Sequence, residues 1–214
     1  MINKINKLFK DFNNYIHGHE KMFVSSVLVP LIQKDDELYL LFQRRSYSMD
    51  AQPGEISFPG GKNEEFDKNH EETAIRETCE ELGVKSENIN IICPLDIFVA
   101  PFNLIINPYL GYISDIGDID KLNINKDEVD HLFLVPIKYF LENEPTLYQT
   151  KIEIIPDKSF PYHLTPNKEN YKFKSGKYDV YFYEYNGYVI WGITAKIIKN
   201  FIDIYKNFLD DKTK

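Results

Sequence analysis

Cysteine is scarce in this chain, and its two thiols do not form a recognisable site. Cys79 and Cys93 are the only cysteines among the 214 residues, and their separation does not match the ligand spacing of a metal site. So little cysteine suits a reducing compartment. We therefore predict a cytoplasmic protein.

The chain also lacks an excess of basic charge and a long apolar run. It has 25 basic and 33 acidic residues, with a formal charge of -8, so it has no broad positive surface for nucleic acid or membranes. No apolar run is long enough to cross a bilayer, and Met1 to Lys4 start no apolar signal segment. We expect no nucleic-acid or membrane partner, and an anionic ligand would need local basic groups or a metal.

What the chain does contain suits one folded domain. Hydrophobic residues make up 43% and aromatic residues 14% of the sequence, which is typical of a globular protein. Apolar residues recur at helical spacing between Ile2 and Ile16. We predict an amphipathic helix within residues 1–22, packed on the domain or at a dimer interface, and one domain over residues 23–214.

Strand patterns dominate the middle of the chain, and helices flank them. We expect a hairpin from residues 23–32 and 38–44 and a helix at the C-terminus that starts at Ile190. Further strands are expected over residues 89–99, 104–114, the last part of 128–136, 146–155 and 179–185. The fold class is therefore α/β, with a mixed central sheet between helices.

The segment from Glu71 to Leu82 reads as a helix that stops at Gly83. Its apolar stripe comprises Ile75, Thr78, Cys79 and Leu82, and its opposite face carries Glu77, Glu80 and Glu81. Carboxylates at this spacing repel one another, and a hard divalent cation such as Mg2+ removes that repulsion. A solvated acidic face is the structural alternative.

The residues around this helix resemble the Nudix box. Gly61 is followed after five residues by Asp67, and after eight more by Arg76-Glu77-x-x-Glu80-Glu81-x-Gly83-Val84. The upstream segment from Arg45 to Gly61 includes Pro53-Gly54-Glu55 and ends in Phe58-Pro59-Gly60-Gly61, which is similar to the coenzyme A pyrophosphatase-like branch of that family. Asp50 departs from the pattern, because the branch usually has a basic residue there.

The resemblance implies a Nudix α/β/α sandwich and a set of metal ligands. Those ligands would be Glu77, Glu80 and Glu81, with Gly61 completing the shell of Mg2+, or of Mn2+ as the alternative metal. Arg76 stands four residues before Glu80 and is predicted to be a catalytic residue that orients or partly neutralises it. Glu80 and Glu128 are both candidates for the general base, because Glu128 matches an acid that recurs before a strand of the family.

Three further residues are predicted to contact substrate. Arg45 suits bidentate contact with phosphate, although an exposed strand end is an equal alternative. Gly60 brings the backbone close to metal or phosphate. Phe102 could stack on a base or simply pack in the core. Asp67 is expected to cap the helix, with an approach to the cation as the alternative, and no histidine among the five in the sequence is assigned a role.

The expected reaction is Mg2+-dependent hydrolysis of the pyrophosphate bond of coenzyme A or its derivatives, as the resemblance implies. The products would be a phosphopantetheine and adenosine 3',5'-bisphosphate, and a homodimer is expected at the family level. One alternative is the same chemistry on ADP-ribose, a dinucleotide or another nucleoside diphosphate derivative. The other is a Nudix-fold binding module without catalysis, which the three intact helix acids disfavour.

Overall fold

The computed structural model describes residues 2, 5, 7, 9–10 and 16–211. Its organising feature is a hairpin of β1 (Phe23–Lys34) and β2 (Glu37–Arg45). Asp35 and Asp36 form the turn with φ angles of 49° and 61°, a conformation that short polar residues tolerate and that matches the twist of a hairpin. The predicted hairpin is confirmed.

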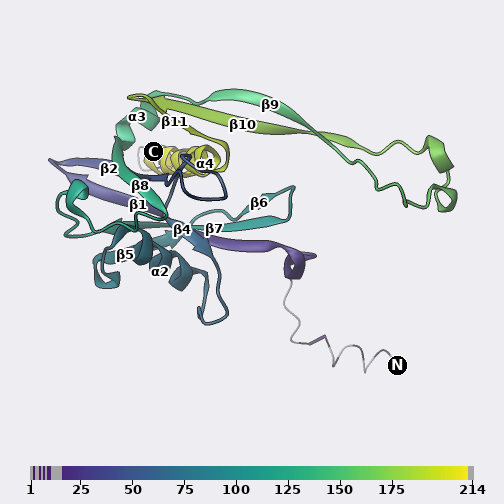
Figure 1. Cartoon of the computed structure of the whole chain (residues 1–214), viewed down its shortest axis with the longest axis horizontal. Coiled ribbons are helices and arrows are strands. Elements are labelled where there is room, and N and C mark those ends of the chain that lie inside the picture. The colour runs from purple at the N-terminus through teal and green to yellow at the C-terminus, as the bar shows by residue number, and fades with distance from the viewer. Residues whose placement is uncertain (1, 3–4, 6, 8, 11–15, 212–214) are drawn as a thin grey trace.

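The hairpin lies inside an eight-stranded mixed sheet (Figure 1). β1 pairs in parallel with β7 (Leu104–Ile113), and the other strand pairs of this sheet are antiparallel. The remaining strands are β3 (Ile56–Ser57), β4 (Gly60–Lys62), β5 (Ile89–Pro94), β6 (Phe98–Ala100) and β8 (Val129–Pro136). The single strand predicted over residues 89–99 is wrong, because residues 95–97 leave the sheet and divide it into β5 and β6.

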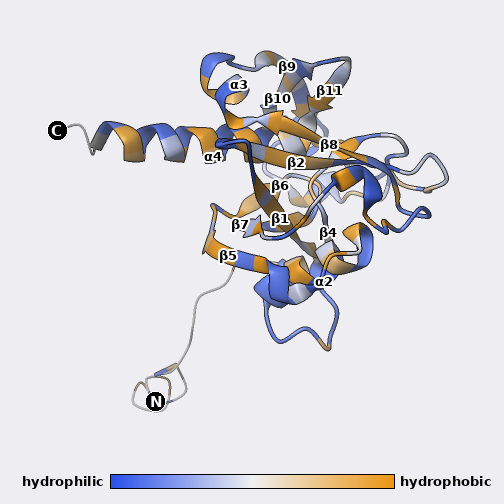
Figure 2. Cartoon of the chain, turned by 90° about the vertical axis from the view of Figure 1, so that its left-hand side faces the viewer, coloured by the Kyte–Doolittle hydropathy of each residue, from blue (hydrophilic) through white to orange (hydrophobic). Residues whose placement is uncertain are grey.

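Helices cover both faces of this sheet, as Figure 2 shows. α2 (His70–Leu82) packs on one face, while α3 (Ile137–Glu142) and α4 (Gly192–Asp211) pack on the other. Successive side chains of β2 point to opposite faces of the sheet. Leu41 therefore packs in the core beside α2, whereas Leu40 and Phe42 pack in the core beside α4. The predicted α/β/α arrangement with a mixed sheet is confirmed.

A second sheet of three strands extends from the body as a long arm (Figure 1). It consists of β9 (Thr146–Glu153), β10 (Ser175–Tyr185) and β11 (Tyr188–Trp191). Asn186 and Gly187 form the turn between β10 and β11 with positive φ angles. The helix predicted from Ile190 is wrong at its start, because Ile190 and Trp191 finish β11 and α4 begins at Gly192.

Short 3-10 turns complete the described chain. They are η1 (His19–Lys21), η2 (Ser86–Asn88), η3 (Ile119–Lys121), η4 (Tyr162–Leu164) and η5 (Lys168–Asn170). The helix predicted within residues 1–22 falls largely outside the described residues, so its packing stays a prediction. In the described part of the chain, no helix is both long enough and apolar enough to span a membrane.

Candidate active site

The ends of α2 are fixed by local hydrogen bonds. At its start, Glu72 N donates to Asn69 Oδ1 at 2.8 Å, so Asn69 is the cap and the prediction that Asp67 caps the helix is wrong. At its end, Gly83 adopts a φ of 68° and its N–H donates to Cys79 O at 2.9 Å. The predicted stop at Gly83 is confirmed.

Two glycines let the backbone of β4 lie close to β1 and to α2. A Cβ atom on Gly60 would lie 2.3 Å from Ser26 O, and one on Gly61 would lie 2.4 Å from the carboxyl carbon of Glu77. Both distances are shorter than any real Cβ contact. Gly60 therefore leaves no room for a side chain against the backbone of β1, and a side chain at Gly61 would displace the Glu77 carboxylate.

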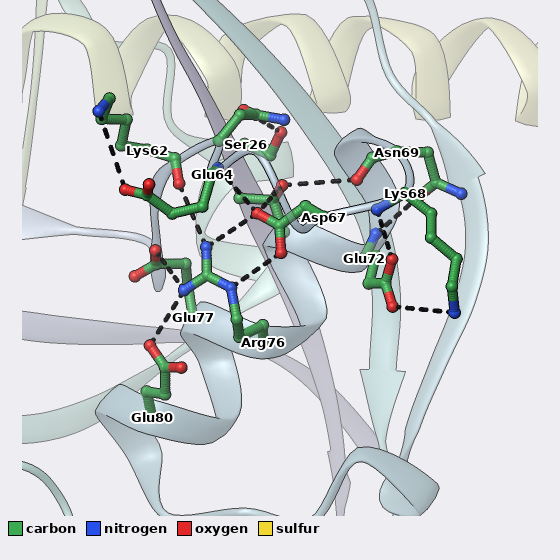
Figure 3. A network of polar contacts seen from close by, with 12 residues as sticks. Ser26, Lys62, Glu64, Asp67, Lys68, Asn69, Glu72, Arg76, Glu77 and Glu80 are labelled. Carbon is green, nitrogen blue, oxygen red and sulfur yellow. Dashed lines mark hydrogen bonds and ion pairs between the residues drawn. The ribbon is translucent and has the colours of Figure 1, made fainter.

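Arg76 joins the acids of α2 to the loop before the helix (Figure 3). Its Nε and Nη2 atoms each donate to a different oxygen of Asp67 at 3.0 Å. Its Nη1 atom donates to Glu77 Oε1 at 2.8 Å and to Glu80 Oε2 at 3.1 Å, and Nη2 also reaches Lys62 O at 3.2 Å. Arg76 thus holds three carboxylates and a backbone carbonyl at once, which confirms its predicted contact with Glu80.

The same contacts explain the electrostatics of Asp67. Hydrogen bonds from Arg76 hold the pKa of Asp67 well below its usual range, and bonds from Glu64 N and Thr73 Oγ1 act in the same direction. The Asp67 side chain is only 2% exposed. Asp67 is therefore a buried, ionised anchor for Arg76.

Glu81 does not lie on an exposed acidic face. It is 3% exposed, and its two oxygens accept from Gly60 N at 2.8 Å and from Gln43 Nε2 at 2.9 Å. The expectation that all three helix acids oppose the buried stripe is therefore wrong for Glu81. Burial raises the pKa of Glu81 to about 8, against the opposing effect of the two hydrogen bonds.

Glu128 joins the helix acids from the loop before β8. The loop is positioned by a hydrogen bond from Ser46 N to Glu128 O at 2.8 Å. The charge of Glu128 raises the pKa of both Glu77 and Glu81, with burial as the larger cause in each case. We call Glu77, Glu80, Glu81 and Glu128 the acidic cluster.

The acidic cluster suits a divalent cation, although Arg76 occupies part of it. Among the described residues, no group of three acidic, histidine or cysteine side chains forms a ready metal cage. Arg76 takes one oxygen each of Glu77 and Glu80, whereas Glu77 Oε2 and Glu80 Oε1 accept no hydrogen bond from the described part of the chain. Two carboxylates with raised pKa, Glu77 and Glu81, lie beside the glycine backbone of β4 and match the oxygen ligands that Mg2+ prefers.

Metal binding at pH 7 should release close to one proton. With a pKa of about 8, Glu81 is mostly protonated at that pH, and a carboxylate must ionise before it binds a cation. Calorimetric titration with Mn2+ in buffers of different ionisation enthalpy measures this release. Wild-type protein at pH 9 and the Glu81→Gln variant at pH 7 should both release almost no protons. If the variant released as many protons at pH 7 as wild type does, the role of Glu81 would be contradicted.

Two of the predicted substrate-binding residues, Arg45 and Phe102, lie outside this hydrogen-bonded group, whereas Gly60 belongs to it through its hydrogen bond to Glu81. Arg45 donates from Nε and Nη2 to Ala51 O at 3.4 and 3.2 Å, so it supports the loop that follows β2. Phe102 is 59% exposed in the turn between β6 and β7. Their contact with substrate stays a prediction.

Gln43 is the site residue that the sequence interpretation missed. It is 1% exposed in β2 and lies 38 residues from Glu81 in the sequence. The one available signal was a polar residue after the apolar run from Leu38 to Phe42, which does not reveal its partner.

Comparison with known proteins agrees with these features. The sequence profile of the NUDIX domain matches residues 22–157. The peroxisomal coenzyme A diphosphatase NUDT7 of Mus musculus is 31% identical over 183 residues, which cover 86% of this chain and 70% of the mouse protein. The mitochondrial coenzyme A diphosphatase NUDT8 of Homo sapiens is 32% identical over 121 residues, which cover 56% of this chain and about half, 51%, of the human protein.

Among solved structures, a binary complex of the Caenorhabditis elegans Ap4A hydrolase overlays with a TM-score of 0.46 and 18% identity, over 56% of this chain and 84% of the other. Nudix hydrolases act on small-molecule nucleotide substrates and generally use divalent metals such as Mg2+. The extent of the profile match and the identity to the mouse enzyme show that this chain belongs to the Nudix hydrolase family.

Proposed function

We propose that this protein hydrolyses the pyrophosphate bond of coenzyme A or its derivatives with Mg2+, or with Mn2+ as the alternative metal. The products are a phosphopantetheine and adenosine 3',5'-bisphosphate. The observation that carries the proposal is the approach of the Glu77 and Glu81 carboxylates to the Gly60–Gly61 backbone of β4. Similarity to two proteins named as coenzyme A diphosphatases supports the choice of substrate.

In this proposal the metal is held by Glu77, Glu80, Glu81 and the carbonyl of Gly61. A bound Mg2+ neutralises phosphate charge and lowers the pKa of water at the site. Gly60 N and Gln43 fix the plane of the Glu81 carboxylate, and Arg76 holds Glu77 and Glu80 on the same side of α2. The chain thus orients its ligands before substrate arrives.

The general base is Glu80 or Glu128. Glu80 has a side chain that is 55% exposed, and Arg76 is its one hydrogen-bond partner among the described residues. Glu128 approaches the cluster from a separate loop, held by Ser46 N. Either carboxylate can take a proton from water at the cluster, and the other then serves as a ligand or as a source of negative charge.

Substrate contacts are assigned to Arg45, Gly60 and Phe102. Arg45 lies at the end of β2, where its N–H groups can turn from Ala51 O to a phosphate. Gly60 keeps the turn free of side-chain atoms. The exposed ring of Phe102 offers a surface for a base.

Assay of a substrate panel tests the proposal. Purified protein with Mg2+ is incubated with coenzyme A, ADP-ribose, NADH and a diadenosine polyphosphate, and products are identified by mass spectrometry. Adenosine 3',5'-bisphosphate from coenzyme A is the expected result. Hydrolysis of another compound alone would support the proposed chemistry with a different substrate. No hydrolysis of any of these compounds would favour a binding module.

Compartment and assembly stay predictions. The names of the relatives include peroxisomal and mitochondrial proteins, and the cytoplasmic location stays an expectation for this chain. A homodimer is likewise an expectation for this chain.

A further inference from the structure

The outer part of the arm is an exposed ribbon that nothing in the described chain covers. We define the arm tip as residues 151–177, which comprise the end of β9, the loop with η4 and η5, and the start of β10. Every residue of β9 except Ile152 is exposed, and the arm reaches away from the body at one end of the molecule (Figure 1). A two-stranded ribbon with both faces in water is marginally stable on its own. The arm tip is therefore suited to be covered by a partner.

The arm tip has a fixed aromatic group and exposed apolar side chains. The ring centre of Phe160 lies 4.9 Å from that of Tyr162 and 5.3 Å from that of Phe173, and the rings of Tyr171 and Phe173 are 5.0 Å apart. These contacts give the loop a defined shape. Other apolar side chains of the tip lie in solvent, with exposed fractions of 58%, 85% and 75% for Ile154, Ile155 and Leu164. Apolar side chains gathered in this way are typical of an interaction surface.

The arm tip is also basic, in contrast to the rest of the chain. It contains six lysines and three acids, a net charge of +3, so the remaining residues of this chain, which totals -8, carry -11. Lys151 pairs with Glu153. The other lysines form no ion pair within 4 Å in the part of the chain that the structure describes, and they are Lys158, Lys168, Lys172, Lys174 and Lys177. A complementary surface for the tip is therefore both apolar and acidic.

A groove with these two properties lies between the turn of the β1–β2 hairpin and the loop after β7. Its volume is about 1040 Å³. Leu38, Ile92 and Tyr112 line it and are 43%, 52% and 45% exposed. The two segments that border it, residues 33–38 and 114–121, contain six acids and two lysines, a net charge of -4. The acids are all exposed, and they are Asp35, Asp36, Glu37, Asp115, Asp118 and Asp120. We call this feature the acidic groove.

The arm tip and the acidic groove of one chain do not meet. The turn between β1 and β2 lies at one end of the molecule and the arm tip at the other (Figure 1). Complementary surfaces at opposite ends can instead meet between two copies of the chain. A two-fold axis perpendicular to the long axis places two copies side by side in opposite directions, so that each arm tip lies at the acidic groove of the other copy.

We propose that the acidic groove binds the arm tip of a second copy of this chain, and that the two copies form a symmetric dimer by exchanging arms. The aromatic group and the exposed apolar residues of the tip fill the groove, and the lysines of the tip face the acids at its border. Both contacts form at once, so each complementary pair of charges occurs twice. Dimerisation weakens as salt is added, because exposed charges are screened.

A charge swap measured by sedimentation equilibrium tests the dimer. The tip variant Lys172→Glu/Lys174→Glu and the groove variant Glu37→Lys/Asp120→Lys should each raise the dimer Kd by at least about 100-fold, because like charges then face one another. An equal mixture of the two variants should form a dimer again, because opposite charges then meet at both contacts. The control Lys21→Glu/Lys68→Glu reverses two exposed lysines outside the tip and the groove, and it should leave Kd unchanged.

Thermal melts separate loss of the dimer from loss of the fold. Each variant carries substitutions at exposed positions only, so its monomer should unfold within a few degrees of the control variant at matched low concentration. Wild-type protein that stays monomeric at about 100 µM, where an interface of micromolar Kd is saturated, would overturn the proposal. A dimer that survives both charge reversals, or a mixture of the two variants that stays monomeric, would overturn it as well.

Discussion

Glu81→Gln should lower kcat by about 1,000-fold, which corresponds to about 4 kcal/mol of transition-state stabilisation. The substitution keeps the size of the side chain and removes the charge that would bind the metal. Initial rates at saturating coenzyme A and Mg2+ measure the effect. Glu87→Gln, which removes an exposed acid paired with Lys85 at 3.4 Å, is the control and should leave kcat unchanged.

The same variant should melt within a few degrees of wild type. Gln43 Oε1 is buried without a hydrogen-bond partner among the described residues, so the Gln43 amide can flip and accept from the new NH2 group. The amide oxygen that the substitution places at position 81 can still accept from Gly60 N, as Glu81 does now. Unchanged turnover in a folded Glu81→Gln protein would refute the role of α2 in catalysis.

Arg76→Met should destabilise the protein by about 3 kcal/mol and lower Tm by about 6–12 °C. The substitution leaves the buried Asp67 carboxylate without its main partner and also frees Glu77 and Glu80. Thermal melts of the variant measure the loss. Lys68→Met, which breaks only an exposed contact with Glu72, should cost less than about 0.5 kcal/mol.

A double variant and a pH series test whether the unpaired Asp67 carboxylate causes this loss of stability. Adding Asp67→Asn to Arg76→Met removes the orphaned charge and should recover part of the stability. Because the pKa of Asp67 is lowered in the folded state, its ionised form stabilises the protein above the ordinary pKa of about 4. The gap between wild type and Asp67→Asn should therefore be full at pH 7 and shrink as the pH falls below about 4. A gap that grows in acid would contradict the lowered pKa of Asp67.

Local patterns in the sequence predicted much of the fold. The hairpin of β1 and β2, the length of α2 and its stop at Gly83 follow from periodicity and turn residues, which act between near neighbours. Asp67 and Asn69 are both good caps, and only the structure shows that Asn69 caps while Asp67 binds Arg76. Which of two such neighbours caps the helix depends on tertiary contacts, and the spacing of residues in the sequence does not determine those contacts.

Long-range contacts account for the rest of the site. Glu81 follows Thr78 by three residues and Ala74 by seven, so it lies on the buried side of α2, where it accepts hydrogen bonds from Gln43 Nε2 and Gly60 N. The start of α4 was misplaced because Ile190 and Trp191 fit the apolar pattern of the helix as well as they fit β11. Because Ile190 and Trp191 pair with β10, they belong to β11 and not to the helix.

The most direct test of the site is an anomalous difference map from crystals soaked in Mn2+. We predict a peak bounded by the carboxylates of Glu77, Glu80 and Glu81, with Glu80 turned away from Arg76. Glu81→Gln crystals should lack the peak. A protein that hydrolyses coenzyme A while its Mn2+ lies away from α2 would contradict the central claim that these carboxylates form the metal centre.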